Sequence, residues 1–163
     1  MKRASPSSQF LAIPSPNWYC KKPLAWSPWE RNLIAMGCKG NVWLLKISPN
    51  AKQCPQPRGV LRRHTSAARA IEIEFAPVTW KRNQCIVLYE SEMVIVWDVL
   101  SQRPTTKIVG TADNSFRCMS IPILSGPSRA KNIVIGCDNG VVIYDNHGTQ
   151  RGSISLSGAV NDI

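Results

Sequence analysis

The stretch that decides the fold is Met93-Val-Ile-Val-Trp-Asp-Val-Leu100. Valine, isoleucine and tryptophan favour a pleated strand, because their branched or flat side chains pack well on a sheet surface. A Trp-Asp pair that closes such a strand is typical of a blade of a β-propeller. The stretch therefore predicts an all-β fold built from repeated four-stranded blades.

Two other stretches repeat this pattern. A shift of 99 residues places Cys38 and its flanking glycine on Cys137 and its flanking glycine. Lys46, Asp98 and Asp145 follow one another at steps of 52 and 47 residues, and each comes after a bulky apolar or aromatic residue. These steps slightly exceed the roughly 40–45 residues of a WD-type repeat, and inserted loops account for the excess.

The chain divides into a tail and a succession of blade-like units. Residues 1–13 begin with a run rich in serine and basic residues, which predicts a disordered basic tail. We expect residues 14–163 to form a WD-repeat propeller segment, with units at about 23–63, 64–110 and 111–157 and the start of a fourth at 158–163. Because propellers close with roughly four to eight blades, three units predict a partial propeller, truncated from a larger ring.

Periodicity and turn residues predict the individual strands. We expect them at 24–26, 32–36, 41–47, 60–61, 70–75, 85–89, 93–100, 104–109, 118–121, 133–135 and 141–144. The apolar and acidic residues that alternate over 70–75 predict a strand buried on one face. Residues 48–59 are rich in proline, asparagine and glutamine and predict a loop. Trp26, Trp43 and Trp97 lie in expected strands, so we expect them to be core residues or to pack between blades.

The charge points to an anionic partner. Twenty lysines and arginines against ten acidic residues give a net charge of +10 at pH 7. Such a balance favours RNA as a partner, although a basic surface that only aids solubility gives the same number. One local cluster surrounds His64 and contains Arg58, Arg62, Arg63 and Arg69.

No motif indicates catalysis, a metal or a membrane. The six cysteines are scattered without the close C-x-x-C spacing of metal or redox sites, which favours buried thiols in a reducing compartment. His64 and His147 lie in no catalytic motif, and Cys38 and Cys137 are best explained as packing residues. We therefore expect a non-enzymatic protein of the cytoplasm or nucleus, without cofactor, metal, membrane segment or small-molecule substrate.

One aromatic pair lies outside every repeat. Trp18 and Tyr19 follow two prolines that hold the chain extended, and Lys21 and Lys22 come just after them. Aromatic faces stack on unpaired bases for roughly 1–3 kcal/mol each, and nearby lysines attract phosphates. These four residues are therefore the candidate RNA-binding site. The alternative is that Trp18 is a wedge that closes one end of the propeller.

The run Pro14-Ser-Pro-Asn-Trp-Tyr-Cys20 resembles the opening of the Gemin family, the RNA-binding WD-repeat proteins of the SMN complex. The rest of the chain resembles this family only in its repeat pattern. The resemblance implies seven-bladed propellers that bind the Sm site and the methylguanosine cap of small nuclear RNAs for snRNP assembly. It also implies SMN-complex proteins as partners, a cytoplasmic and nuclear location, and RNA contacts by Trp18 and Tyr19.

Two functions follow from these observations. The first is RNA binding through Trp18 and Tyr19, with phosphates held by the basic residues. The second is a WD-repeat scaffold that binds proteins through its rim loops without direct RNA binding. Salt separates the two, because contacts with several phosphates weaken steeply as salt rises, whereas an apolar interface changes little.

Overall fold

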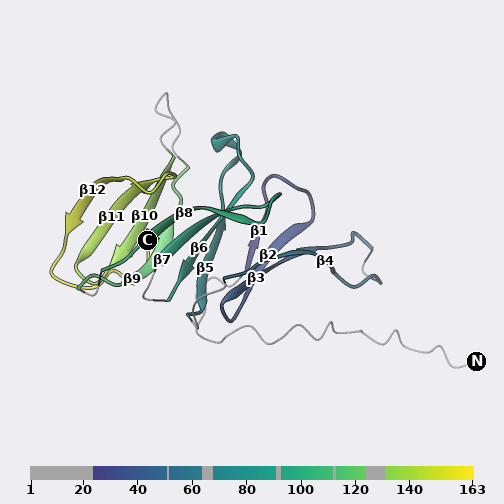
Figure 1. The fold of residues 1–163 in the computed structure, drawn as a ribbon, viewed down its shortest axis with the longest axis horizontal. Helices are drawn as coiled ribbons and strands as arrows, with labels where there is room; N and C mark the ends of the chain where they lie inside the picture. The colour runs from purple at the N-terminus through teal and green to yellow at the C-terminus, as the bar shows by residue number, and fades with distance from the viewer. Residues whose placement is uncertain (1–23, 51, 64–67, 91–92, 112, 124–130) are drawn as a thin grey trace, which may run out of the picture.

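Three four-stranded antiparallel sheets make up the fold of this protein (Figure 1). The computed structural model describes residues 24–50, 52–63, 68–90, 93–111, 113–123 and 131–163. Only one short 3-10 turn, Val78–Trp80, interrupts the strands and loops of these described residues. The all-β fold with three blade-like sheets of a partial propeller is thereby confirmed. The expected tail at 1–13 lies outside the described residues.

Within each sheet the strands follow one another in chain order. The first sheet contains β1 (Leu24–Trp26), β2 (Leu33–Cys38), β3 (Asn41–Lys46) and β4 (Gln56–Leu61). The second contains β5 (Ala70–Phe75), β6 (Gln84–Tyr89), β7 (Met93–Asp98) and β8 (Arg103–Val109). The third contains β9 (Phe116–Ser120), β10 (Asn132–Cys137), β11 (Gly140–Asp145) and β12 (Gln150–Ser155). Figure 1 shows β4 and β12 at opposite outer edges.

The three sheets share one irregularity. The third strand of each sheet ends at Lys46, Asp98 or Asp145, the residues that the sequence repeat aligns. Two residues before each of these ends, the pairing with the outer strand shifts register, between Leu44 and Leu45, Val96 and Trp97, and Ile143 and Tyr144. A bulge at the same place in every sheet twists the outer strand in the same way, so the sequence repeat is also a structural repeat.

Two outer strands differ from the expectation. Residues 56–59, expected as part of a loop, belong to β4, whose Pro57 lies opposite Leu45. Proline is tolerated there because an edge strand need not donate every ladder hydrogen bond. The strand β12 was not expected, since Gln150–Ser155 is polar and largely exposed. The stretch Met93–Leu100, expected as a single strand, is a strand only as far as Asp98, because a turn begins at Val99.

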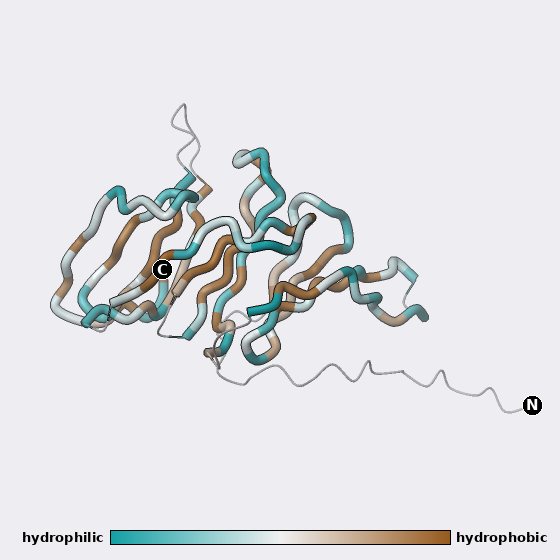
Figure 2. Tube along the Cα trace, viewed as in Figure 1, coloured by the Kyte–Doolittle hydropathy of each residue, from teal (hydrophilic) through white to brown (hydrophobic). Residues whose placement is uncertain are grey.

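The middle sheet is buried on both faces. On β6, Cys85 and Val87 belong to the apolar cluster shared with the first sheet, whereas Ile86 and Leu88 belong to the cluster shared with the third. Figure 2 shows the corresponding continuous hydrophobic colour along the central strands. A strand covered on both faces needs apolar residues throughout, which explains the uninterrupted run of β6.

The acidic residues of β5 join the second sheet to the third. Glu72 is only 1% exposed, and its carboxylate accepts a hydrogen bond from the Met119 N–H. The Glu74 carboxylate accepts another from the Ile121 N–H at 3.1 Å. The expectation that β5 is buried on one face is therefore wrong, because its acidic side chains serve as acceptors for the neighbouring inner strand rather than facing water.

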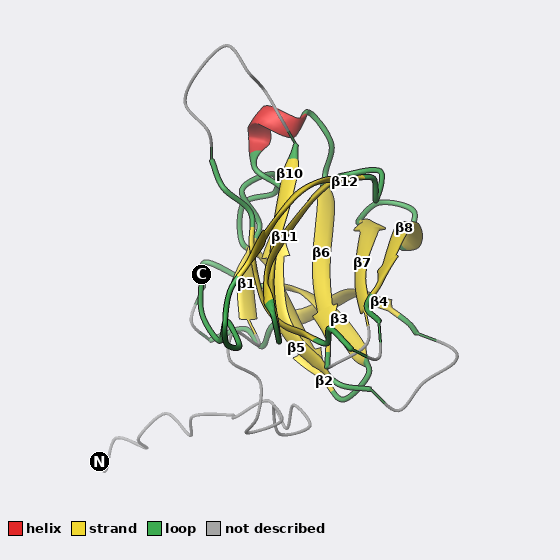
Figure 3. Ribbon diagram, turned by 90° about the vertical axis from the view of Figure 1, so that its left-hand side faces the viewer, coloured by secondary structure: helices red, strands yellow, loops and turns green. Residues whose placement is uncertain are grey.

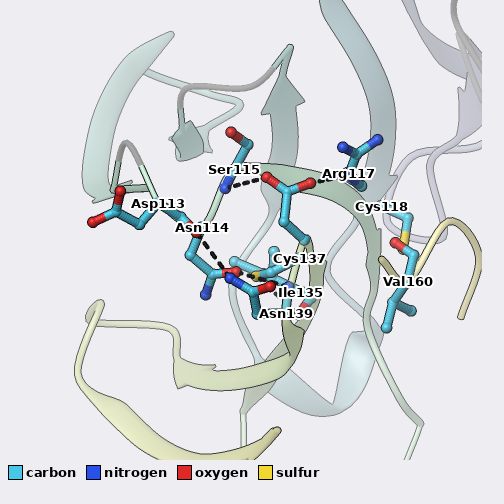
Figure 4. Close-up of polar contacts among 10 residues, drawn as sticks. Asp113, Asn114, Ser115, Arg117, Cys118, Ile135, Cys137, Asn139 and Val160 are labelled. Atoms are coloured by element: carbon cyan, nitrogen blue, oxygen red, sulfur yellow. Dashed lines mark hydrogen bonds and ion pairs between the residues drawn. The ribbon is translucent and has the colours of Figure 1, made fainter. Parts of the chain in front are cut away.

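Residues 158–163, expected to start a fourth unit, contain no strand, but Val160 packs on the third sheet (Figure 4). Its N–H donates to the Cys137 carbonyl oxygen at 2.9 Å, and the Cys118 thiol donates to the Val160 carbonyl oxygen at 3.3 Å. Gly136 leaves room for this contact, since a Cβ there would lie 2.9 Å from Val160 Cγ1. The arrangement resembles that of Ala70, which packs beside Gly37 at the start of the second sheet.

Candidate nucleic-acid interface

The aromatic pair expected to bind RNA lies outside the described residues. This holds for all four candidates, Trp18, Tyr19, Lys21 and Lys22, and also for His64. Of the basic cluster around His64, the arginines at 58, 62, 63 and 69 are described. The candidate interface therefore consists of the described cations.

A cleft of about 760 Å³ separates the outer strands of the first and second sheets. One wall is the end of β4 and the residues just after it, and the other wall is formed by β7 and β8. Its lining residues are Gly59, Val60, Arg62, Arg63, Met93, Ile95, Trp97, Gln102, Arg103, Pro104 and Lys107.

Four cations border this cleft, two from each sheet. Arg62 and Arg63 directly follow Leu61, whose fully buried side chain anchors the end of β4. Arg103 and Lys107 lie on β8, where Lys107 pairs with Ile95. No aspartate or glutamate is among the described residues that line the cleft. The lining itself thus carries only positive charge, and low-dielectric walls focus the field of such a lining into a cleft.

One aromatic residue, Trp97, is among the described residues that line the cleft, and it is only 2% exposed. The Arg63 guanidinium lies 4.8 Å from the centroid of the buried Tyr89 ring. Burial raises the pKa of the Tyr89 hydroxyl, and the neighbouring Cys85 raises it further, against smaller opposite effects of Trp97 and Arg63. Tyr89 therefore stays neutral at physiological pH, and its ring holds Arg63 in place through a cation–π contact.

Gln102 connects the two walls. Its side-chain oxygen accepts a hydrogen bond from the Val60 N–H at 3.3 Å, so the turn after β7 is tied to β4. Gln102 itself has a positive φ of 57°, as the tight turn between β7 and β8 requires. A side chain at position 59 would displace Gln102, because a Cβ there would lie 2.2 Å from the Gln102 side-chain nitrogen. The glycine therefore leaves room for the hydrogen bond that connects the two walls.

Such a cleft can bind phosphate groups. Arginine and lysine side chains on both walls supply several donors to a phosphodiester backbone, and the exposed Arg62, Arg103 and Lys107 can adjust to it. Sequence reasoning identified Arg62 and Arg63 but missed Arg103 and Lys107. The signal that could have found the latter pair is the position of two cations on an edge strand of the next repeat.

Other residues that the sequence analysis considered serve the fold rather than the cleft. Cys137 is fully buried, and burial, with smaller contributions from Cys118 and Asp138, raises its pKa to about 11. The His147 N–H donates to Asp145 Oδ1 at 2.9 Å in the turn between β11 and β12. Trp97 is a core residue as expected, but Trp26 is not, because its side chain is 61% exposed.

Within the described part of the chain, no three His, Cys, Asp or Glu side chains gather where they could hold a metal ion. Likewise, none of its helices is long and apolar enough to span a membrane. No protein-family model matches the chain, and no curated protein matches its sequence.

Proposed function

We propose that the protein is a non-enzymatic RNA-binding propeller segment of the WD type. The observation that carries this proposal is the cleft between β4 and β7–β8, where four cations meet and no described lining residue is acidic. The cleft holds the phosphate backbone of a single strand, and Trp18 and Tyr19, followed by Lys21 and Lys22, stack on its bases. The net charge of +10 supports long-range attraction of the same ligand.

The resemblance to the Gemin family narrows the proposed ligand. It favours small nuclear RNA, recognised through its Sm site and methylguanosine cap, in cytoplasmic and nuclear snRNP assembly with other SMN-complex proteins. The described residues contribute the sequence-independent part of this recognition, because phosphate contacts set affinity and salt dependence but do not read bases.

The experiment is a salt titration of the full chain with a fluorescein-labelled, uridine-rich RNA of twelve nucleotides. The double variant Arg62→Gln, Lys107→Gln removes one exposed cation from each wall. If each cation holds one phosphate, the slope of log affinity against log salt becomes shallower by roughly 1.4, since each contact with a single strand contributes roughly 0.7. Fluorescence anisotropy measures the affinity.

The matched control is Lys52→Gln, Arg82→Gln, which removes the same charge from exposed positions that do not line the cleft. This control should lower the RNA affinity slightly, because it reduces the net charge, and should leave the salt slope nearly unchanged. Equal slopes for the two double variants would assign RNA attraction to the overall charge rather than to the cleft. A second variant, Trp18→Ala with Tyr19→Ala, should weaken binding without changing the salt slope.

A further inference from the structure

A groove of about 290 Å³ lies where the inner strands of the three sheets end. These inner strands, β1, β5 and β9, are the first strands of their sheets, and the groove is formed at their carboxyl ends. The 3-10 turn Val78–Trp80, drawn red in Figure 3, lies at this end of the molecule. The groove is lined by Trp26, Pro28, Glu74, Phe75, Pro77, Val78, Thr79, Ile121 and Ile123.

Each of the three repeat units contributes one large exposed apolar side chain to this groove, from the end of β1, from the 3-10 turn after β5 and from the loop after β9. Trp26 is 61% exposed, Val78 57% and Ile123 75%. These residues come from positions far apart in the sequence, so their convergence is a product of the fold. An exposed apolar patch in a hollow marks an interaction surface, and a tryptophan in such a hollow is the residue type most often found to dominate binding energy.

Hydrogen bonds hold the loops around the groove. The Trp29 indole N–H donates to the Ala76 carbonyl oxygen at 2.6 Å, which ties the loop after β1 to the loop after β5. The Ile121 N–H donates to Glu74 at 3.1 Å, which ties β5 to the chain after β9. Lys81 closes the 3-10 turn, with its N–H donating to the Val78 carbonyl oxygen. A partner therefore meets a preformed surface and loses little free energy in ordering it.

Exposed cations follow the lining residues in two of the loops that border the groove. Arg31 follows Pro28 in the first loop, and Lys81 and Arg82 follow Val78 in the second; all three are exposed. Glu30 pairs with Lys46 at 3.4 Å. Glu74 is the one charged residue among the described residues that line the groove, and its carboxylate accepts the Ile121 N–H. Apart from this carboxylate the lining is mainly apolar, and the exposed cations lie in the loops just beyond it, so the complement is an apolar side chain with carboxylates placed outside the groove.

We infer that this groove binds a segment of a partner protein in which a bulky apolar or aromatic side chain is flanked by aspartates or glutamates. The side chain packs between Trp26, Val78 and Ile123, and the flanking carboxylates meet Arg31, Lys81 and Arg82. A nucleobase fits less well, because most of the described lining is proline and aliphatic, and of its two oxygen-bearing side chains, Glu74 and Thr79, Glu74 already accepts the Ile121 N–H. This surface is distinct from the cationic cleft, which it does not share residues with.

The test is a selection of random twelve-residue peptides, displayed on phage, against the full chain. Enriched peptides should combine one or two bulky apolar residues with several aspartates or glutamates. Their affinity, measured by fluorescence anisotropy on synthetic peptides, should fall about tenfold or more for Trp26→Ser, and for Lys81→Glu with Arg82→Glu. The control Leu100→Ser changes an apolar side chain of similar exposure on the turn after β7 and should leave affinity unchanged.

Three outcomes would overturn the inference: no enrichment of such peptides, equal binding by Trp26→Ser and Leu100→Ser, or a loss of uridine-rich RNA binding in Trp26→Ser. The last outcome would make the groove an RNA surface. Circular dichroism and thermal unfolding of each variant test whether its fold is intact. Because Trp26 is absent from the cleft, failure here leaves the RNA proposal standing, and failure of the cleft variants leaves this inference standing.

Discussion

The second and third sheets share one repeat but differ in what covers them. Val96 on β7 and Ile143 on β11 occupy the same place, directly before the recurring bulge. Val96 is fully buried against the third sheet, whereas Ile143 is only half-buried. The corresponding residue of the first sheet, Leu44, is fully buried against the second. The comparison shows that the stability contributed by a residue at this repeat position depends on whether the next sheet covers it, and not on its own sheet.

The largest expected difference in stability is between alanine substitutions at Leu44 and at Ile143. Leu44→Ala should lower the free energy of unfolding by about 3 kcal/mol, because it removes a fully buried side chain and leaves a cavity between two sheets. Ile143→Ala should lower the free energy of unfolding by about 1 kcal/mol, since its side chain is only partly buried. Urea denaturation followed by circular dichroism measures both. Equal losses would mean that the outer face of the third sheet is covered in solution.

The second effect concerns the turn that closes the third sheet. The carboxylate of Asp145 accepts the N–H groups of His147 and Thr149, both at 2.9 Å, and the Arg151 guanidinium at 2.6 Å. Asp145→Asn should destabilise the protein by about 2 kcal/mol at pH 7, because these bonds are made to a charged group.

The same variant has a defined pH dependence. Burial raises the pKa of Asp145, but the hydrogen bonds from Thr149, Arg151 and His147 together hold it below its usual range. The stability that depends on this charge is therefore present above the ordinary aspartate pKa and is lost as the pH falls through the lowered, folded-state value. The difference between wild type and Asp145→Asn should shrink on acidification from pH 7 to below 4 in thermal unfolding. The exposed Asp113→Asn is the control, and a constant difference across this range would contradict the assignment.

The smallest expected change in stability concerns the contact between Gly136 and Val160. A Cβ on Gly136 would lie 2.3 Å from Cys118 Sγ and 2.9 Å from Val160 Cγ1. Gly136→Ala should therefore displace Val160, speed the hydrogen exchange of its amide and cost about 1 kcal/mol of global stability. Gly158→Ala, with no atom near its Cβ position, is the matched control. Unchanged exchange at Val160 in Gly136→Ala would show that this contact does not persist in solution.

Repeat spacing and β-branched runs were sufficient to predict the three blades and most strand positions. The runs at Ala70–Phe75 and Gln84–Tyr89 were recognisable because local side-chain chemistry favours a pleated strand whatever surrounds it. The polar outer strands β4 and β12 were harder to predict, since an edge strand is held by backbone hydrogen bonds to the third strand of its sheet and needs no apolar pattern of its own.

The sequence by itself determined the all-β class, the repeat and the positive charge. Only the tertiary structure decided which residues meet: it placed Arg62 across a cleft from Lys107, buried Glu72 beneath the inner strand of the third sheet, and left Trp26 exposed beside Val78 and Ile123. The physical reason is that burial and electrostatic potential are properties of neighbouring sheets in space. A residue's own propensity specifies its strand, but the sheet packed against it determines whether its side chain becomes core, acceptor or binding surface.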